Sequence, residues 1–438
     1  MQGPPAARDC VVPYEAKTQK MSAGHEESWD GFVHRENDIM SDKNEFDIVA
    51  IGRSSVVLCG QQIGSRLEDT ESFRKTVGGA AAGIAIGTAR LGLKSALIAR
   101  IGDEPMGRFV RGQLMRERVD VRGVRADPRR LTSLVLQGAY DEDTFSRVLY
   151  GENCADTALE EDDIDETFLA SSRAVVVTGS YFACADAMAA QQKAIRIARA
   201  HGIKVVLDID YRPGLADSEA HLAPLLPLCD LIVGTREGFA LVGGGKDVPA
   251  SLRAIRARSP ATIVCERGPM GCVVFPGEIA DHPDDGLRGP GLSTDTHSAP
   301  GGGEAFVSGF LRGWLRGESP ETCSRFADAC TALAVSRLPG VPESPTWPEL
   351  AHFLEHGCRY STPREDPDLG HLHWATTRRP QPETVMALAI DHRAQLEAIA
   401  DAAMVSRERI DPFKTLAVRA AVQVARLSLI HISEPTRL

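Results

Sequence analysis

Residues 298–306 read Ser-Ala-Pro-Gly-Gly-Gly-Glu-Ala-Phe, and the apolar-periodic run Val307–Leu311 follows them. The pattern predicts a helix that begins at Gly301, Gly302 and Gly303, with the carboxylate of Glu304 in its first turn. Unpaired N–H groups at a helix start favour negative charge, and glycines let a phosphate approach them closely. A carboxylate beside them can accept a hydroxyl proton during phosphoryl transfer. The alternative is structural, with Glu304 serving only as an acidic first-turn residue of a glycine-capped helix.

Length and composition narrow the class of protein. The chain has 438 residues, which favours two folding units, and its 43% hydrophobic and 25% charged residues are ordinary for a globular protein. A net charge of −11 argues against a nucleic-acid-binding surface. The ten cysteines are scattered without a Cys-x-x-Cys pair, which predicts reduced thiols, no metal ligands and a cytoplasmic location. No signal peptide is evident and no apolar run has the roughly 18 residues of a membrane helix, so no membrane partner is expected.

Apolar β-branched segments alternate regularly with helical segments of 10 to 17 residues. This alternation predicts βαβ units and a parallel sheet that is buried on both faces. The expected strands cover residues 46–52, 95–102, 174–179, 204–210, 231–234 and 262–265. Ligands of such sheets bind beyond the carboxyl ends of the strands. The polar groups that follow the strands, and that favour a functional role for the turn 301–304, are Thr178, Asp210, Arg212, Thr235 and Glu266.

A second glycine pair, Gly78-Gly79, precedes a run of small residues that predicts a helix through Leu91. The pair is equally consistent with a turn that approaches a ligand and with a tight strand-to-helix connection. Asp210 and Arg212 are also open to two interpretations. Asp210 can bind substrate or serve as a turn residue before Pro213, and Arg212 can bind a carboxylate or phosphate or lie on the surface.

These motifs occur in the order and spacing of a known family, and residues 46 to about 355 resemble the PfkB/ribokinase family of sugar kinases. The resemblance implies a ribokinase-like three-layer α/β sandwich, with a mostly parallel central sheet and a small β lid. Four segments are similar in particular to the family branch that phosphorylates 5-dehydro-2-deoxygluconate in inositol catabolism. They are residues 60–68, 152–156, 208–213 and 267–272.

The resemblance also implies a division of the chain. We expect a disordered leader at 1–44, the kinase domain at 45–355, a linker at 356–370 and, at 371–426, the truncated start of an aldolase-like domain whose first strand is 386–393. Residues 427–438 look like translated sequencing-adapter DNA, and we expect them to be an artefact.

By resemblance the cofactors are ATP and Mg²⁺, the partner is a small sugar acid, and a homodimer is possible. The catalytic group would be Glu304 with the helix start Gly301, Gly302 and Gly303. The residues implied to bind substrate are Gly78, Gly79, Asn153, Asp210 and Arg212. The residues implied to bind nucleotide are Thr235, Gly268 and Gly271.

Several residues differ from the family pattern at positions that the family uses for catalysis or ligand binding. Glu304, which is one methylene longer, stands in place of the catalytic aspartate, and Glu266 reverses the charge of a lysine near the nucleotide. Polar or charged family residues are also replaced at Val57, Gly83, Gly151, Gly238 and Asp328. Each lost polar contact typically costs about 1–3 kcal/mol, so we expect an intact fold with impaired kinase activity. The alternative is a catalytically inactive pseudokinase that acts as a ligand-binding or assembly module.

Overall fold

The structure is a computed structural model that describes residues 44–425, apart from 63, 139–145, 181–184, 211–217, 245–246, 281, 283–285, 293, 295–300, 338–343, 359, 361 and 378–392. Its centre is a nine-stranded sheet of order β13-β12-β11-β10-β9-β8-β1-β4-β5. The strands are β1 (Phe46–Ile51), β4 (Ser95–Gly102), β5 (Val124–Asp127), β8 (Ser172–Thr178), β9 (Lys204–Asp208), β10 (Leu231–Thr235), β11 (Thr262–Glu266), β12 (Cys272–Phe275) and β13 (Leu287–Arg288). Neighbouring strands from β5 to β11 are parallel, whereas β12 and β13 are antiparallel.

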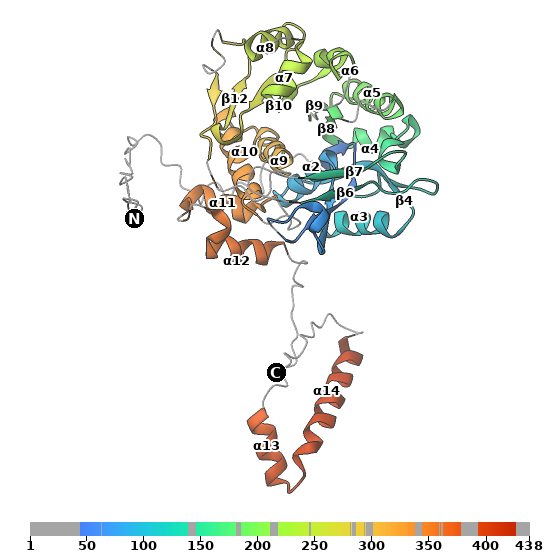
Figure 1. The fold of residues 1–438 in the computed structure, drawn as a ribbon, viewed down its shortest axis with the longest axis vertical. Helices are drawn as coiled ribbons and strands as arrows, with labels where there is room; N and C mark the ends of the chain where they lie inside the picture. Colours follow the sequence, from blue (N-terminus) through green and yellow to red (C-terminus); the bar gives the residue numbers. More distant parts are fainter. Residues whose placement is uncertain are drawn as a thin grey trace, which may run out of the picture. The chain divides into compact units, whose positions relative to one another are not determined.

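Helices cover both faces of this sheet (Figure 1). One face carries α4 (Glu166–Ala170), α5 (Ala185–Ala200), α6 (Ser218–Leu222), α7 (Arg236–Val242) and α8 (Val248–Arg256). The other carries α2 (Ala80–Arg90), α3 (Pro105–Arg116), α9 (Gly302–Trp314) and α10 (Pro320–Val335). Strand β1 shows why two cores form, because Val49 and Ile51 pack on the first face while Ile48 and Ala50 pack on the second. The expected three-layer sandwich is confirmed.

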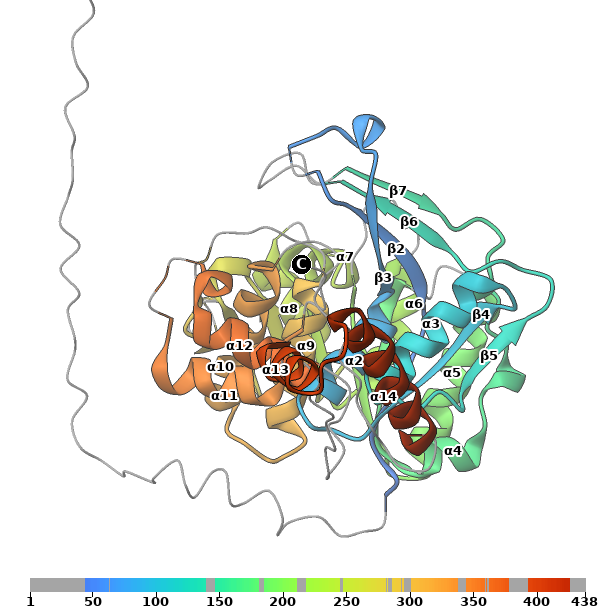
Figure 2. The same ribbon diagram turned by 90° about the horizontal axis from the view of Figure 1, so that it is seen from below.

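A smaller sheet of order β3-β2-β6-β7 projects from the second face (Figure 2). It consists of β2 (Ser55–Gly60), β3 (Phe73–Gly78), β6 (Leu134–Gln137) and β7 (Arg147–Tyr150). Strand β3 leads through Gly79 directly into α2, so this sheet is tied to the helical layer that also contains α9. It is the small lid that the resemblance implies.

The six expected strands are confirmed in place and nearly in length. The antiparallel edge was not predicted. It arises because the backbone turns sharply between β11 and β12, where Gly268 and Gly271 both have positive φ angles (58° and 76°). The return strand β12 then pairs beside β11 without a crossover helix.

Beyond α10 the chain continues as α11 (Trp347–His356), a 3₁₀ turn at Pro363–Glu365 and α12 (Pro367–Thr376). The linker expected at 356–370 covers the residues that join α11 to α12 and the first residues of α12 itself. Its last residues begin a helix, since the Asp366 carboxylate accepts hydrogen bonds from the N–H groups of Asp368 (3.0 Å) and Leu369 (3.3 Å).

Helix α12 is anchored to the kinase fold through the buried carboxylate of Glu349 on α11. This carboxylate accepts hydrogen bonds from the N–H (2.8 Å) and hydroxyl (2.9 Å) of Thr346, pairs with the Arg337 guanidinium and lies 3.1 Å from Nδ1 of His373 on α12. Those partners lower the pKa of Glu349 despite its burial. Residues on both sides of the expected domain boundary therefore share one buried network.

Farther along, α13 (Arg393–Ala402) and α14 (Ile410–Ala425) pack on each other. Residues 1–43 of the expected leader, 386–392 of the expected strand and all of the expected artefact 427–438 lie outside the described residues. Among the described residues no helix combines the length and apolar content that crossing a membrane requires.

Candidate active site

The start of α9 has the geometry that its glycines predict. Gly301 caps the helix in the left-handed region (φ 92°), and its carbonyl accepts the Ala305 N–H at 3.0 Å. Gly302 is buried, and a Cβ there would lie 3.0 Å from Val335 Cγ1. A Cβ on Gly303 would meet only open space. The first turn, in which Gly303 is exposed, thus presents backbone N–H groups with Glu304 beside them.

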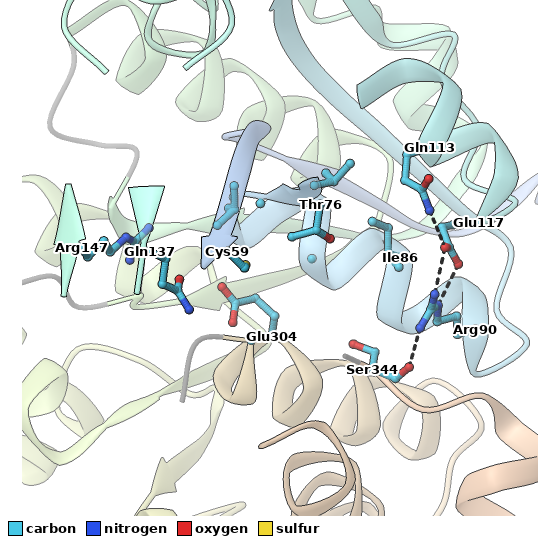
Figure 3. Close-up of a pocket in the computed structure, with 16 residues that line it drawn as sticks. Cys59, Thr76, Ile86, Arg90, Gln113, Glu117, Gln137, Arg147, Glu304 and Ser344 are labelled. Atoms are coloured by element: carbon cyan, nitrogen blue, oxygen red, sulfur yellow. Dashed lines mark hydrogen bonds and ion pairs between the residues drawn. The ribbon is translucent and has the colours of Figure 1, made fainter. Parts of the chain in front are cut away.

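Glu304 lines a pocket of about 140 Å³ between α9, α2 and the lid. In Figure 3 its carboxylate points toward the lid strands. Of the expected site residues, Gly78, Gly79, Gly301 and Glu304 line this pocket together. The other residues that line it are Val57, Cys59, Thr76, Val77, Gly83, Ile86, Arg90, Gln113, Glu117, Gln137, Arg147 and Ser344.

The glycine pair after β3 has a backbone reason as well as a place in the pocket wall. Gly79 has a φ of 98°, and a Cβ there would lie 2.3 Å from the carbonyl oxygen of Arg53. A Cβ on Gly78 would lie 2.4 Å from Val57 Cγ2. The two interpretations that the sequence left equal are thus compatible, because the tight connection itself forms the wall.

The lid contributes a row of polar side chains that the sequence analysis missed. Cys59 on β2 pairs in register with Gln137 on β6, which pairs with Arg147 on β7, and all three line the pocket. Figure 3 shows Gln137 and Arg147 across the cavity from Glu304. Each residue is unremarkable in its own segment, and only the strand pairing brings them together.

The far end of the pocket is closed by an ion pair. The guanidinium of Arg90 donates to both carboxylate oxygens of Glu117 (2.7 and 2.8 Å) and to the carbonyl of Ser344 (2.8 Å). Its side chain is only 4% exposed. The positive charge of Arg90 is therefore already balanced within the fold.

The expected nucleotide residues lie at the carboxyl ends of β10 and β11. Thr235 pairs in register with Glu266, and its hydroxyl accepts the Gly238 N–H at 3.2 Å as the N-cap of α7. Gly268 has open space where a Cβ would lie, whereas a Cβ on Gly271 would lie 2.6 Å from the Gly291 nitrogen. Gly268 therefore leaves room for a ligand, and Gly271 is needed for close packing of two loops.

Carboxylates crowd the same edge of the sheet. Burial, together with the charges of Asp208, Glu304, Asp328 and Asp210, raises the pKa of Glu266 well above its usual range. Burial also raises the pKa of Asp328 to about 6, although its Oδ2 accepts the Gly291 N–H at 3.1 Å. The effect of the Glu304 charge on Glu266 connects the start of α9 to the strand ends.

Two expected substrate residues have partners of their own. Asp210 has a φ of 41°, its carboxylate accepts the Ser180 hydroxyl, and its N–H donates to Asp208 Oδ1 at 3.1 Å. Asn153 has a φ of 52°, accepts a hydrogen bond from Arg130 Nε at 3.1 Å and does not line the Glu304 pocket. Arg212 lies outside the described residues. Within the described residues, no three His, Cys, Asp or Glu side chains are grouped to hold a metal ion.

Residues 46–347, which contain the sheet, the lid and this pocket, match the model of the pfkB family of carbohydrate kinases. The chain belongs to this family. Residues 349–431 match a second model, described as an uncharacterized protein conserved in bacteria (DUF2090). The two matches meet between Thr346 and Glu349, inside the buried network that joins α11 and α12 to the kinase domain.

Curated relatives of this pfkB kinase include the 5-dehydro-2-deoxygluconokinase of Bacillus velezensis, which is 30% identical over 72% of this chain and 96% of the relative. A PfkB protein from Polaromonas sp. JS666 superposes with a TM-score of 0.61 at 25% identity, over 70% of this chain and 99% of that chain. Fructokinase from Vibrio cholerae O395, bound to fructose, ADP and calcium, shares the fold at a TM-score of 0.61 and 24% identity, over 71% of this chain and 100% of that one.

The residues of this pfkB kinase fit a bound nucleotide in part. The open backbone at Gly268 and Gly303 can approach phosphate oxygens. The carboxylates around Glu266 oppose a polyphosphate unless they bind protons or a cation. The edge formed by Gly268, Gly303 and these carboxylates therefore suits Mg·ATP better than it suits ATP alone.

Proposed function

We propose that this pfkB kinase transfers a phosphoryl group from ATP to a sugar acid of the 5-dehydro-2-deoxygluconate type, more slowly than its relatives do. The observation that carries the proposal is the position of Glu304, at the exposed start of α9 and in the wall of a pocket that the lid covers. The names of relatives about 30% identical to this chain support the substrate class.

The side chains of the pocket have complementary roles in this reaction. Glu304 accepts the proton of the attacking sugar hydroxyl, and the N–H groups from Gly301 to Gly303 stabilise negative charge on the phosphoryl oxygens. The guanidinium of Arg147 pairs with the carboxylate of the sugar acid, because its planar fork suits a carboxylate. Gln137, beside it in register, binds a sugar hydroxyl.

The cofactor would lie over Gly268 and the start of α9, and when bound it supplies the phosphoryl group and the neutralising cation. No lysine balances the acidic edge at position 266, so Mg²⁺ has to offset several carboxylates there. Slow turnover follows from this crowding and from the apolar or missing side chains at Val57 and Gly151. The same crowding favours the second candidate, a fold that binds ligand without catalysis.

The test combines a thermal-shift titration with Mg·ATP and a kinase assay with 5-dehydro-2-deoxygluconate, on the full chain. A ligand at 100 times its Kd adds about 2.7 kcal/mol of stability. We expect stabilisation with slow turnover, loss of turnover in Glu304→Gln, and a raised KM for the sugar acid in Arg147→Ala. Stabilisation without turnover supports the non-catalytic alternative, and absence of both overturns the proposal.

A further inference from the structure

The side chain of Glu304 lies directly across Gly83, on the helix that faces it. A Cβ at position 83 would lie 2.9 Å from Cγ and 3.1 Å from Cβ of Glu304. Real Cβ atoms essentially never approach another atom as closely as 2.9 Å. The atoms in question are the stem of Glu304 and not its flexible end. Any side chain at position 83 would therefore force Glu304 into another rotamer.

The next turn of the same two helices shows a similar fit. A Cβ on Gly87 would lie 2.3 Å from the hydroxyl oxygen of Ser308. That hydroxyl donates to the Glu304 carbonyl at 2.6 Å. Two glycines one turn apart on α2 thus receive two residues one turn apart on α9, and the second contact fixes the backbone of Glu304 relative to α2.

Glycine inside a helix is less favourable than alanine, because it loses more backbone entropy on folding. Gly83 lies in a run of α2 that is otherwise rich in alanine. The absence of a side chain at this position therefore needs a local reason, and the stem of Glu304 is the group that fills the space.

We propose that Gly83 is a positioning residue, whose missing side chain leaves room for the Cβ and Cγ atoms of Glu304 and so holds its carboxylate in the pocket. The inference rests on the proposed function of Glu304 as the proton acceptor. It makes positions 83 and 304 one coupled unit, so that a side chain added at position 83 acts on catalysis through the Glu304 carboxylate.

The activity test compares Gly83→Ala with the wild type, and Gly112→Ala is the control. Gly112 also lies inside a helix, and a Cβ there would meet nothing within 4 Å. Displacing a catalytic group by about 1 Å can cost around 10²-fold. We expect Gly83→Ala to lower kcat about 100-fold with little change in KM, and Gly112→Ala to have no effect. Equal behaviour of the two alanine variants overturns the inference.

A stability cycle keeps the inference testable if the protein has no turnover, an outcome that would contradict only the proposed function. Gly83→Ala should lower the melting temperature by roughly 3 °C or more in the presence of Glu304. In a Glu304→Ala background the same substitution should leave the melting temperature unchanged or raise it, as Gly112→Ala does in both backgrounds. An equal loss with and without the Glu304 side chain would show that Gly83 serves helix packing alone.

Discussion

The carboxyl group of Asp328 is held where its charge is costly, and replacing it with the neutral amide of asparagine (Asp328→Asn) should stabilise the protein. The residue is 5% exposed, and a Cβ on Gly289 or Gly271 would lie only 2.4 or 2.9 Å from its Oδ2. The N–H of Gly291 donates to the same oxygen at 3.1 Å. An asparagine amide has the same shape and keeps that acceptor, so the substitution removes the charge and leaves the packing intact.

The magnitude follows from the pKa shift. Burial raises the pKa of Asp328 from 3.8 to about 6, and each pKa unit corresponds to about 1.4 kcal/mol, so the effect is about 3 kcal/mol. The folded state binds the proton more tightly than the unfolded state. The stability that protonation of Asp328 contributes is therefore complete below pH 3.8, falls as the pH rises and is lost above about pH 6. At pH 7 the asparagine variant should be more stable by up to about 3 kcal/mol, and the difference should shrink toward pH 4.

Urea unfolding of both proteins between pH 4 and 8 measures this difference. Other carboxylates titrate in both proteins and largely cancel, apart from Glu266, whose pKa Asp328 helps to raise. The exposed Asp162 provides the control, and Asp162→Asn should change stability little at any pH. A difference between wild type and Asp328→Asn that stays constant from pH 5 to 8 would refute the reasoning, as would a destabilised variant at pH 7.

Three other sites lead to predictions of their own. Glu266→Lys should tighten Mg·ATP binding in a thermal-shift titration, since it removes a carboxylate from an acidic cluster; unchanged or weaker binding would contradict this role. Gly79→Ala should destabilise the protein by more than Gly92→Ala, both measured by urea unfolding. Both glycines have a positive φ (98° and 83°), but only at Gly79 would the new Cβ also meet a backbone oxygen, at 2.3 Å; equal losses would show that φ alone matters. Glu349→Ala should cost about 3–5 kcal/mol, because it removes the carboxylate of a buried ion pair with Arg337, whereas Asp401→Ala, which breaks an exposed pair, should cost less than about 1 kcal/mol; similar losses would argue against the anchoring of α12.

The order of strands and helices could be predicted from the sequence because each depends on local pattern. Apart from Asp47, the run Phe46–Ile51 is apolar on both faces, which favours a place between two helical layers. The residues after the strands could be placed at one edge for the same reason, and Glu304, Thr235 and Glu266 do interact there. The start of α12 could not be predicted, because a helix that begins with Asp366 and Pro367 has the composition of a loop.

Local patterns of residues thus specify the layered fold and the edge at which the chemistry lies, since periodicity and strand ends are properties of contiguous residues. How the site is filled depends on tertiary packing. The row of Cys59, Gln137 and Arg147 requires pairing between strands, and the fit of Glu304 over Gly83 requires two helices more than two hundred residues apart in the chain to lie at the right distance. Contacts of this kind have no local pattern, because packing and not periodicity brings their members together.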